Sequence, residues 1–235
     1  MLVVGFPTGA FQANCFLVAP ERGGPCVIVD PGQDAEEPIA AALREHDLTP
    51  VAALLTHGHL DHVFSVAPVC DGSDIPAWVH PDDRFMLSDP ARGLSAQAAS
   101  FFGGLELREP KEVRELTDGA ELDLAGLRFT VTHTPGHTEG SVVFGHDTAD
   151  DDHLLFAGDT LFAGSIGRTD LPGGDMAKMT ASLRRLLALD DETVVLPGHG
   201  GATTIGRERA SNPFLTGVVD LGEPSAAHKG RGRGL

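Results

Sequence analysis

The sequence predicts an α+β fold in which β-sheets are sandwiched between layers of helices. Short apolar runs recur along the whole chain, amphipathic helical patterns lie between some of them, and the composition is that of a globular protein. The 235 residues are 41% hydrophobic and 22% charged, which suffices for a substantial core in a single domain. We expect this folded domain over residues 1–215, followed by a flexible glycine-rich and basic tail over residues 216–235.

The predicted strands are short apolar runs with the length and composition of buried strands. The first half of the chain is strand-rich and hairpin-like, whereas the second half mixes strands with helices. In chain order we expect strands at Cys15–Ala19, Cys26–Asp30, Val51–Leu55, Ala77–His80, Leu127–His133, Ser141–Gly145, His153–Ala157 and Thr193–Leu196.

The predicted helices carry apolar residues at helical spacing. Asp175 is a suitable N-cap for the third of them, because a carboxylate can accept hydrogen bonds from the first free N–H groups of a helix. The segment Ser88–Pro110 is expected to be an irregular or helical connection, with a lid as the alternative. The helices are expected at Glu36–His46, Leu60–Cys70, Asp175–Leu189 and Thr203–Ala210.

Charge and composition exclude several classes of function. The net charge of −17 disfavours a nucleic-acid partner, since phosphate binding requires a basic face. Cys15, Cys26 and Cys70 lack the spacing of a disulfide framework or a thiolate zinc site. No apolar run approaches the roughly 18 residues of a membrane span. The start of the chain lacks the pattern of a signal peptide, so we expect a cytoplasmic protein without a membrane partner.

The hexapeptide from His57 to His62 is the most informative segment of the chain. It places His57, His59, Asp61 and His62 directly after an apolar run that is expected to be a strand. Imidazole and carboxylate groups are the ligands that zinc and neighbouring divalent metals bind at neutral pH. His57 and His59 would project to the same side of an extended backbone. Taken alone, the hexapeptide could also be a polar turn.

Three further candidate ligands each follow a predicted strand. His137 lies in a Thr-Pro-Gly-His-Thr segment, Asp159 in Ala-Gly-Asp-Thr, and His199 in Leu-Pro-Gly-His-Gly. Loops at strand ends are where a rigid sheet presents convergent functional side chains. Each segment alone indicates only a turn, but their common placement makes a joint metal site the stronger interpretation.

In this order, the seven residues resemble the ligand pattern of the metallo-β-lactamase fold superfamily, over about residues 2–215. The resemblance implies an αββα sandwich with a two-metal site at one edge of its sheets. It implies two divalent ions, with zinc as the first candidate and iron or manganese as alternatives. By this resemblance the first metal would be held by His57, His59 and His137, and the second by Asp61, His62 and His199, with Asp159 bridging both.

Residues around the ligands carry weaker signals. Asp30 resembles an acidic residue that the superfamily places beneath the site, where it would orient a ligand. It could equally be the cap of a turn that ends a strand. His133 precedes the Pro-Gly-His turn and is interpreted as structural rather than as a ligand.

The segment from Gly158 to Asp170 indicates the reaction. It is similar to the corresponding loop of hydroxyacylglutathione hydrolases (glyoxalase II) and closer still to their compact bacterial relatives. Asp159 also stands where many β-lactamases of the superfamily carry cysteine. The resemblance implies a metal-dependent hydrolase acting on a small-molecule acyl-thiol, by attack of a metal-bridging hydroxide on the thioester. Asp61 and Asp159 would be the catalytic carboxylates.

The substrate is less well defined. Arg168 falls where glyoxalase II has a basic residue that contacts glutathione, so it could bind a substrate carboxylate, or it could simply pair with Asp170. The chain has no tyrosine, so the tyrosines with which glyoxalase II holds glutathione are missing. It also ends soon after the His199 segment, where larger glyoxalase II enzymes have a helical domain. A different thiol carrier or a wider cleft would suit these departures.

Other functions remain alternatives. The Gly167–Asp170 segment also resembles the loop of persulfide dioxygenases, which use one iron held by two histidines and one aspartate. Lactonase, other ester hydrolase and phosphodiesterase activities are further alternatives. A non-catalytic protein is disfavoured, since such members typically lose ligands. The sequence does not determine the oligomeric state.

Overall fold

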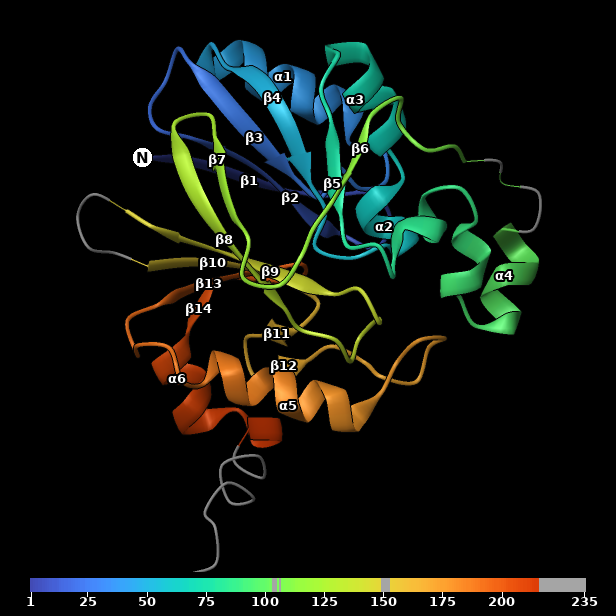
Figure 1. The fold of residues 1–235 in the computed structure, drawn as a ribbon, viewed down its shortest axis with the longest axis vertical. Coiled ribbons are helices and arrows are strands. Elements are labelled where there is room, and N and C mark those ends of the chain that lie inside the picture. Colours follow the sequence, from blue (N-terminus) through green and yellow to red (C-terminus); the bar gives the residue numbers. More distant parts are fainter. Residues whose placement is uncertain (103–104, 106, 149–152, 216–235) are drawn as a thin grey trace, which may run out of the picture.

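Two six-stranded β-sheets pack face to face, and helices cover both outer faces (Figure 1). The computed structural model describes residues 1–102, 105, 107–148 and 153–215. This arrangement is the αββα sandwich that the sequence predicts, built as a single domain.

The first sheet has the strand order β1-β2-β3-β4-β5-β6. β1, β2 and β3 are antiparallel neighbours, and β3 to β6 are parallel to one another. The parallel part departs from the expected hairpin-like first half, because α1 and α3 supply crossover connections between parallel strands. The bounds are β1 Leu2–Thr8, β2 Ala13–Ala19, β3 Pro25–Val29, α1 Glu36–His46, β4 Thr49–Leu54, α2 Leu60–Val63, α3 Val66–Ser73, β5 Ala77–Val79 and β6 Val113–Glu115.

The second sheet has the order β14-β13-β10-β9-β8-β7. β10 and β13 are parallel, and the other neighbours are antiparallel. The short strands β11 and β12 form a separate hairpin. The bounds are β7 Glu121–Leu124, β8 Leu127–His133, β9 Val142–Asp147, β10 His153–Gly158, β11 Leu161–Phe162, β12 Ser165–Ile166, α5 Met176–Leu186, β13 Val194–Pro197, β14 Thr203–Thr204 and α6 Ile205–Ser211.

Apolar side chains fill three layers between these elements. One layer joins α1 and α3 to the first sheet, through residues such as Ile39 and Val66. The middle layer lies between the sheets and contains the fully buried rings of Phe129, Phe144 and Phe156. The third layer packs α5 and α6 against the second sheet. Alternate residues of a strand point to opposite faces, so each sheet can serve two layers at once.

Strand direction brings separate loops to one edge of the sandwich. β8 and β10 are both antiparallel to β9, and β10 is parallel to β13, so all three end at the same edge of the second sheet. β4 of the first sheet ends at the same edge. Just after β4, the carbonyl of Thr56 accepts a hydrogen bond of 2.8 Å from the backbone N–H of Val142, at the start of β9. The loops after β4, β8, β10 and β13 therefore meet.

Every predicted strand is present within two residues of its expected bounds, and Leu127–His133 and Glu36–His46 match as predicted. The expected helix Leu60–Cys70 was wrong, because it divides into α2 and α3. Pro68 lies in the first turn of α3, where its missing N–H is tolerated, whereas inside a continuous helix it would break the bond to the carbonyl of Phe64. Asp175 caps α5 as predicted, accepting bonds from the N–H groups of Ala177 and Lys178.

The Ser88–Pro110 segment follows the 3₁₀ turn η1, Arg84–Leu87, and contains the 3₁₀ turn η2, Pro90–Gly93, and the helix α4, Ala96–Phe102. The predicted tail over residues 216–235 lies outside the described residues. Within the described part of the chain, no helix has both the length and the apolar character needed to cross a membrane.

Candidate metal centre

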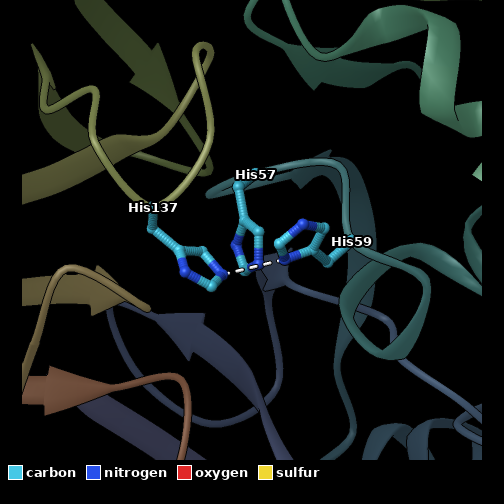
Figure 2. A group of neighbouring side chains, drawn as sticks. All are labelled: His57, His59 and His137. Carbon is cyan, nitrogen blue, oxygen red and sulfur yellow. Dashed lines mark hydrogen bonds between the residues drawn. The ribbon is translucent and has the colours of Figure 1, made fainter. Parts of the chain in front are cut away.

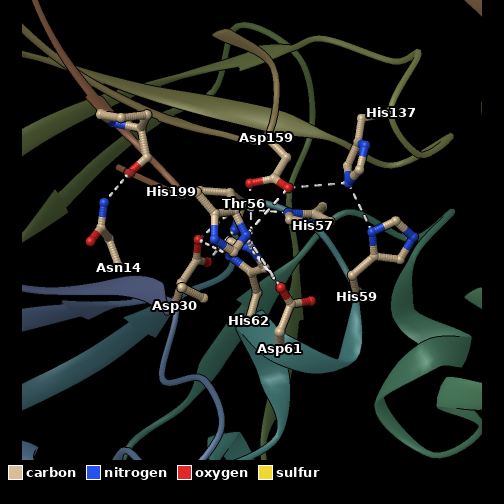
Figure 3. A network of polar contacts seen from close by, with 12 residues as sticks. Asn14, Asp30, Thr56, His57, His59, Asp61, His62, His137, Asp159 and His199 are labelled. Carbon is tan, nitrogen blue, oxygen red and sulfur yellow. Dashed lines mark hydrogen bonds and ion pairs between the residues drawn. The ribbon is translucent and has the colours of Figure 1, made fainter. Parts of the chain in front are cut away.

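The seven predicted ligands gather at the edge where the loops meet. His57 and His59 lie in the loop after β4, and Asp61 and His62 lie in the short helix α2 that follows it. The loops after β8, β10 and β13 supply the other three, which are His137, Asp159 and His199. Figure 3 shows their side chains converging from both sheets.

Three histidines form the more buried group. His57, His59 and His137 are 1%, 5% and 2% exposed, and one nitrogen of each lies within 4.8 Å of the others (Figure 2). The closest approach is 2.8 Å, between Nδ1 of His59 and Nε2 of His137. Such a convergence of three buried imidazoles suits a divalent transition metal.

Asp61, His62 and His199 form the second group. Nε2 of His199 lies 3.3 Å from Oδ2 of Asp61 and 3.3 Å from Nε2 of His62. The side chains of Asp61 and His199 are 22% and 28% exposed, whereas His62 is fully buried. This group is therefore the one more open to solvent.

Asp159 lies between the two groups. Its Oδ2 is 3.5 Å from Nε2 of His137 and 3.6 Å from Nε2 of His199, and its Oδ1 is 3.4 Å from Nε2 of His62. Figure 3 shows this carboxylate on one side of the imidazoles and that of Asp61 on the other. A carboxylate with two oxygens in this place can serve both groups, as the sequence resemblance implies.

The far nitrogen of three histidines is held by the surrounding protein. Nδ1 of His62 donates to Asp30 Oδ2 at 3.0 Å, and Nδ1 of His137 donates to the carbonyl of Arg168 at 2.8 Å. The Thr56 hydroxyl donates to Asp30 at 2.6 Å, so Nδ1 of His57, 3.1 Å away, is left to donate to that hydroxyl. Each bond assigns a proton to Nδ1, so that Nε2 is the nitrogen that faces the centre.

Asp30 thus orients the candidate ligand His62, the contact that one of its two predicted roles requires. It is 2% exposed, has a left-handed backbone (φ 50°), and also accepts the N–H of Thr56 at 2.8 Å. Asp30 therefore both forms the backbone turn that ends β3 and supports the ring of His62.

Burial and neighbouring charge act differently on the two groups. Burial lowers the pKa of His57 well below its ordinary value, and the other imidazoles lower it further. Burial and His137 likewise lower the pKa of His59. Burial also lowers the pKa of His62, but the carboxylates of Asp61 and Asp159 outweigh it and raise that pKa to about 10. His57 and His59 are therefore neutral, whereas His62 belongs to a charged network.

Buried atoms without partners provide a test of whether these residues suit a metal. Nε2 of His57, Nε2 of His59 and Oδ1 of Asp159 are buried and have no hydrogen-bond partner. A buried polar atom left unpaired costs about 1–3 kcal/mol, so such atoms are rare without a reason. Two of these three atoms, Nε2 of His57 and Oδ1 of Asp159, face the centre and are candidate ligand atoms. The donor set and its unpaired atoms fit divalent metal ions.

Asp83 is a supporting residue that sequence reasoning missed. It is 1% exposed and accepts three hydrogen bonds, from Gly58 N at 2.9 Å, Thr138 Oγ1 at 2.6 Å and Gly140 N at 2.8 Å. Burial raises the pKa of this carboxyl despite those donors. Asp83 therefore ties the loop that carries His57 to the loop that carries His137. Its donors are far away in sequence, so no local pattern marks it.

The loop that carries His199 is held by the first sheet. Nδ2 of Asn14 donates to the carbonyls of Pro197 and Gly200, both at 2.9 Å, and Asn14 N donates to the carbonyl of Gly198 at 2.7 Å. Gly198 must lack a side chain, because a Cβ there would collide with Oδ1 of Asp159. This close approach explains the glycine in the Pro-Gly-His turn.

Two further features concern residues named from the sequence. Arg168 is paired with Asp170 through two hydrogen bonds of 2.7 Å, and it also lines the cleft beside the metal centre. His133 stacks on His80 with ring centroids 4.1 Å apart, and its Nε2 donates to the carbonyl of Glu139. His133 is not among the seven converging residues, but its ring lies with His80 and Asp82 in a separate group of potential ligand atoms within 4.8 Å of one another, so its structural role stays a prediction.

Comparison with known proteins gives the family. Residues 8–199 match the family model of the metallo-beta-lactamase superfamily. Among curated relatives, an uncharacterised protein of Mycobacterium tuberculosis is 51% identical. The match covers 93% of this chain and 99% of that relative. The hydroxyacylglutathione hydrolase GloC of Haemophilus influenzae is 38% identical over 89% of this chain and 95% of its own length.

Two solved structures are similar over whole chains. BLEG-1 B3 metallo-beta-lactamase is 39% identical, with a TM-score of 0.80 and coverage of 92% of this chain and 100% of that chain. TTHA1623 in a di-iron-bound form is 41% identical, with a TM-score of 0.75 and the same coverage. The chain belongs to the metallo-beta-lactamase superfamily, and within it the chain is a metallo-hydrolase.

Proposed function

We propose that this protein is a thioesterase that hydrolyses small acylated thiols at a centre holding two divalent metal ions. The observation that supports this most is the complete donor set of seven His and Asp side chains, with unpaired buried ligand atoms in it. The similarity to GloC, a hydroxyacylglutathione hydrolase, favours a thioester as substrate. Zinc is the proposed metal. Iron is the alternative that the di-iron form of TTHA1623 supports.

The proposed metal ions would be held by His57, His59 and His137 on one side and by Asp61, His62 and His199 on the other, with Asp159 shared. Divalent ions at such a site supply Lewis acidity, which lowers the pKa of water and polarises a carbonyl.

The protein's own groups position the reactants. Asp61 faces the cleft with a partly exposed carboxylate, so it can accept a hydrogen bond from an attacking water. Asp30 and the carbonyl of Arg168 hold the protons of His62 and His137 away from the centre. A thiolate leaves without strong acid assistance, because the pKa of a thiol is near 8.5, and no cysteine or serine of the chain is needed as nucleophile.

Hydrolysis of S-lactoylglutathione and of other acyl-thiols, measured before and after removal of metal by a chelator, tests this proposal. We expect turnover that is lost on chelation and restored by zinc. A β-lactam substrate belongs in the same assay, because the similarity to BLEG-1 B3 metallo-beta-lactamase favours that activity as an alternative. Turnover of the β-lactam without turnover of any thioester would contradict the proposal.

An iron-dependent oxidation is the other outcome that would replace the hydrolase. One iron per chain, together with oxygen uptake and sulfite release from a persulfide, would identify a persulfide dioxygenase instead. We also propose a small-molecule substrate rather than nucleic acid, since the net charge is −17, and a cytoplasmic location.

A further inference from the structure

The cleft beside the metal centre combines apolar side chains with polar groups of the centre. It has a volume of about 290 Å³, and its polar lining includes His59, Asp61, His137, Asp159 and His199. Its apolar atoms come from several separate segments: the β1–β2 turn, α2, the η2–α4 segment and the loop after β12. These residues are Phe11, Leu60, Leu94, Ala98 and Leu171.

Phe11 is the largest of these apolar residues. It lies in the β1–β2 turn, and its side chain is 58% exposed although it borders the cleft. An aromatic ring in this position can bury apolar area against a ligand and so stabilise its binding. The cleft thus offers an apolar surface for an acyl group next to the groups that would perform hydrolysis.

The cationic side chain that lines the same cleft is already paired with a carboxylate of the protein. Arg168 is the one arginine or lysine among the described residues that line it. Its Nε and Nη2 donate to Oδ1 and Oδ2 of Asp170, both at 2.7 Å. This two-point contact occupies the Nε–Nη2 edge of the guanidinium group, which is an edge that binds carboxylates through two parallel hydrogen bonds. The carboxylate of Asp170 thus neutralises the positive charge of Arg168, which a substrate carboxylate would need for its own binding.

The remaining charged groups do not replace Arg168. The carboxylates of Asp61 and Asp159 line the cleft, and the chain as a whole carries a net charge of −17. Any metal ions at the centre would face the reacting thioester rather than distant groups of the carrier. Glutathione bears two carboxylates and one ammonium group, so its recognition calls for cations that this cleft does not leave free.

We propose that the cleft selects thioesters of apolar acyl groups on thiol carriers that have no free carboxylate, and that the Arg168–Asp170 pair excludes glutathione-type carriers. This inference rests on the proposed thioesterase function, and it narrows the substrate class of the same site. Phe11 and Asp170 are then residues that determine specificity, for the acyl group and the carrier respectively.

Binding of stable thioethers tests the inference without turnover. S-hexyl-N-acetylcysteamine and S-hexylglutathione share the apolar chain and differ in the carboxylates of the carrier. By calorimetry on the metal-loaded protein, we expect the neutral thioether to bind about tenfold more tightly, the effect of one unfavourable charge contact. Equal or tighter binding of S-hexylglutathione would overturn the inference.

Asp170→Asn tests the part played by the ion pair. Freeing Arg168 should tighten binding of S-hexylglutathione more than that of the neutral thioether and so reduce the tenfold difference. Asp123→Asn is the matched control, because Asp123 pairs with the exposed Arg128 outside the cleft lining. An unchanged ratio in Asp170→Asn, or the same change in Asp123→Asn, would contradict the role of Asp170.

Turnover separates this inference from the function on which it rests. We expect a higher kcat/KM for S-hexanoyl-N-acetylcysteamine than for S-lactoylglutathione, and Phe11→Ala should lower the first value about tenfold. A preference for S-lactoylglutathione would refute the inference and leave the thioesterase proposal intact. Turnover of neither thioester would refute both.

Discussion

The two halves of the candidate metal centre are built differently. His57, His59 and His137 are almost fully buried, and burial lowers the pKa of His57 and of His59. Asp61 and His199 are partly exposed at the cleft, and with His62 they form a charged network. The buried half is suited to holding a metal firmly. The open half is suited to contact with water and substrate.

The supports of the two halves differ as well. Asp83 joins the loops of His57 and His137 within the buried half, through backbone N–H groups and a threonine hydroxyl. Asp30 supports His62 of the open half directly, by a charged contact to its ring. One carboxylate therefore fixes the loops and the other fixes a ligand, so their removal should have different effects.

The largest effect is expected for the ligands themselves. His59→Ala and His199→Ala should each lower thioesterase kcat/KM by about a thousandfold, because both halves are needed for hydrolysis. The halves should differ in metal content, with His199→Ala keeping the metal of the buried half. Kinetics and elemental analysis of both variants check this. His153→Ala, a histidine outside the cluster, serves as the control, and wild-type turnover in either ligand variant would exclude the site.

Asp83→Ala should have the next largest effect, on stability. The change leaves buried donors on Gly58, Thr138 and Gly140 without their acceptor, at a cost of about 3 kcal/mol in the free energy of unfolding. Urea denaturation of the metal-free protein measures this separately from metal binding. A loss below about 0.5 kcal/mol, the range of an ordinary surface substitution, would show that Asp83 does not hold the two loops together.

Asp30→Asn should act more strongly on the open half, because Asp30 contacts His62 directly and reaches His57 only through the Thr56 hydroxyl. The amide keeps the size of the carboxylate but loses its charge toward His62, so the affinity for the second metal should fall by about 10- to 100-fold. Zinc titration with a competing chelator measures both affinities. An equal loss at both halves would mean that Asp30 supports the whole centre rather than His62.

The smallest effect is expected for Asp175→Ala. Asp175 caps α5 and its own N–H donates to the carbonyl of Gly136, beside His137. Loss of the cap should cost about 1 kcal/mol of stability, and the backbone bond to Gly136 can remain. Thermal unfolding together with metal content checks this, since a loss of metal from the buried half would reveal a stronger coupling of α5 to His137.

The comparison between the halves also shows what sequence can predict. The seven candidate ligands follow strands or lie close together in sequence, so local patterns and the superfamily resemblance were enough to select residues that the fold brings together. Asp83 and Asn14 escaped because their partners are distant: Asp83 bonds to residues 25 to 57 positions away, and Asn14 to one 183 positions away. Only tertiary structure reveals such supports.

The fold was predictable to a similar extent. Short apolar runs marked the central strands, and the third predicted helix was found with its cap. β1 was missed because its residues are mostly half-exposed, so it lacks the continuous apolar character of a buried strand. β11, β12 and β14 have two residues each, and cross-strand pairing rather than residue type defines them.

Metal content per chain tests the two-metal centre most directly. The protein would be stripped with a chelator, reloaded with zinc, freed of unbound metal and measured by elemental analysis. We predict two zinc ions in the wild-type protein, one in His199→Ala and fewer than one in Asp159→Ala, whose carboxylate lies between the halves. A wild-type protein that binds no zinc, or an Asp159→Ala variant that keeps two ions, would contradict the proposed centre.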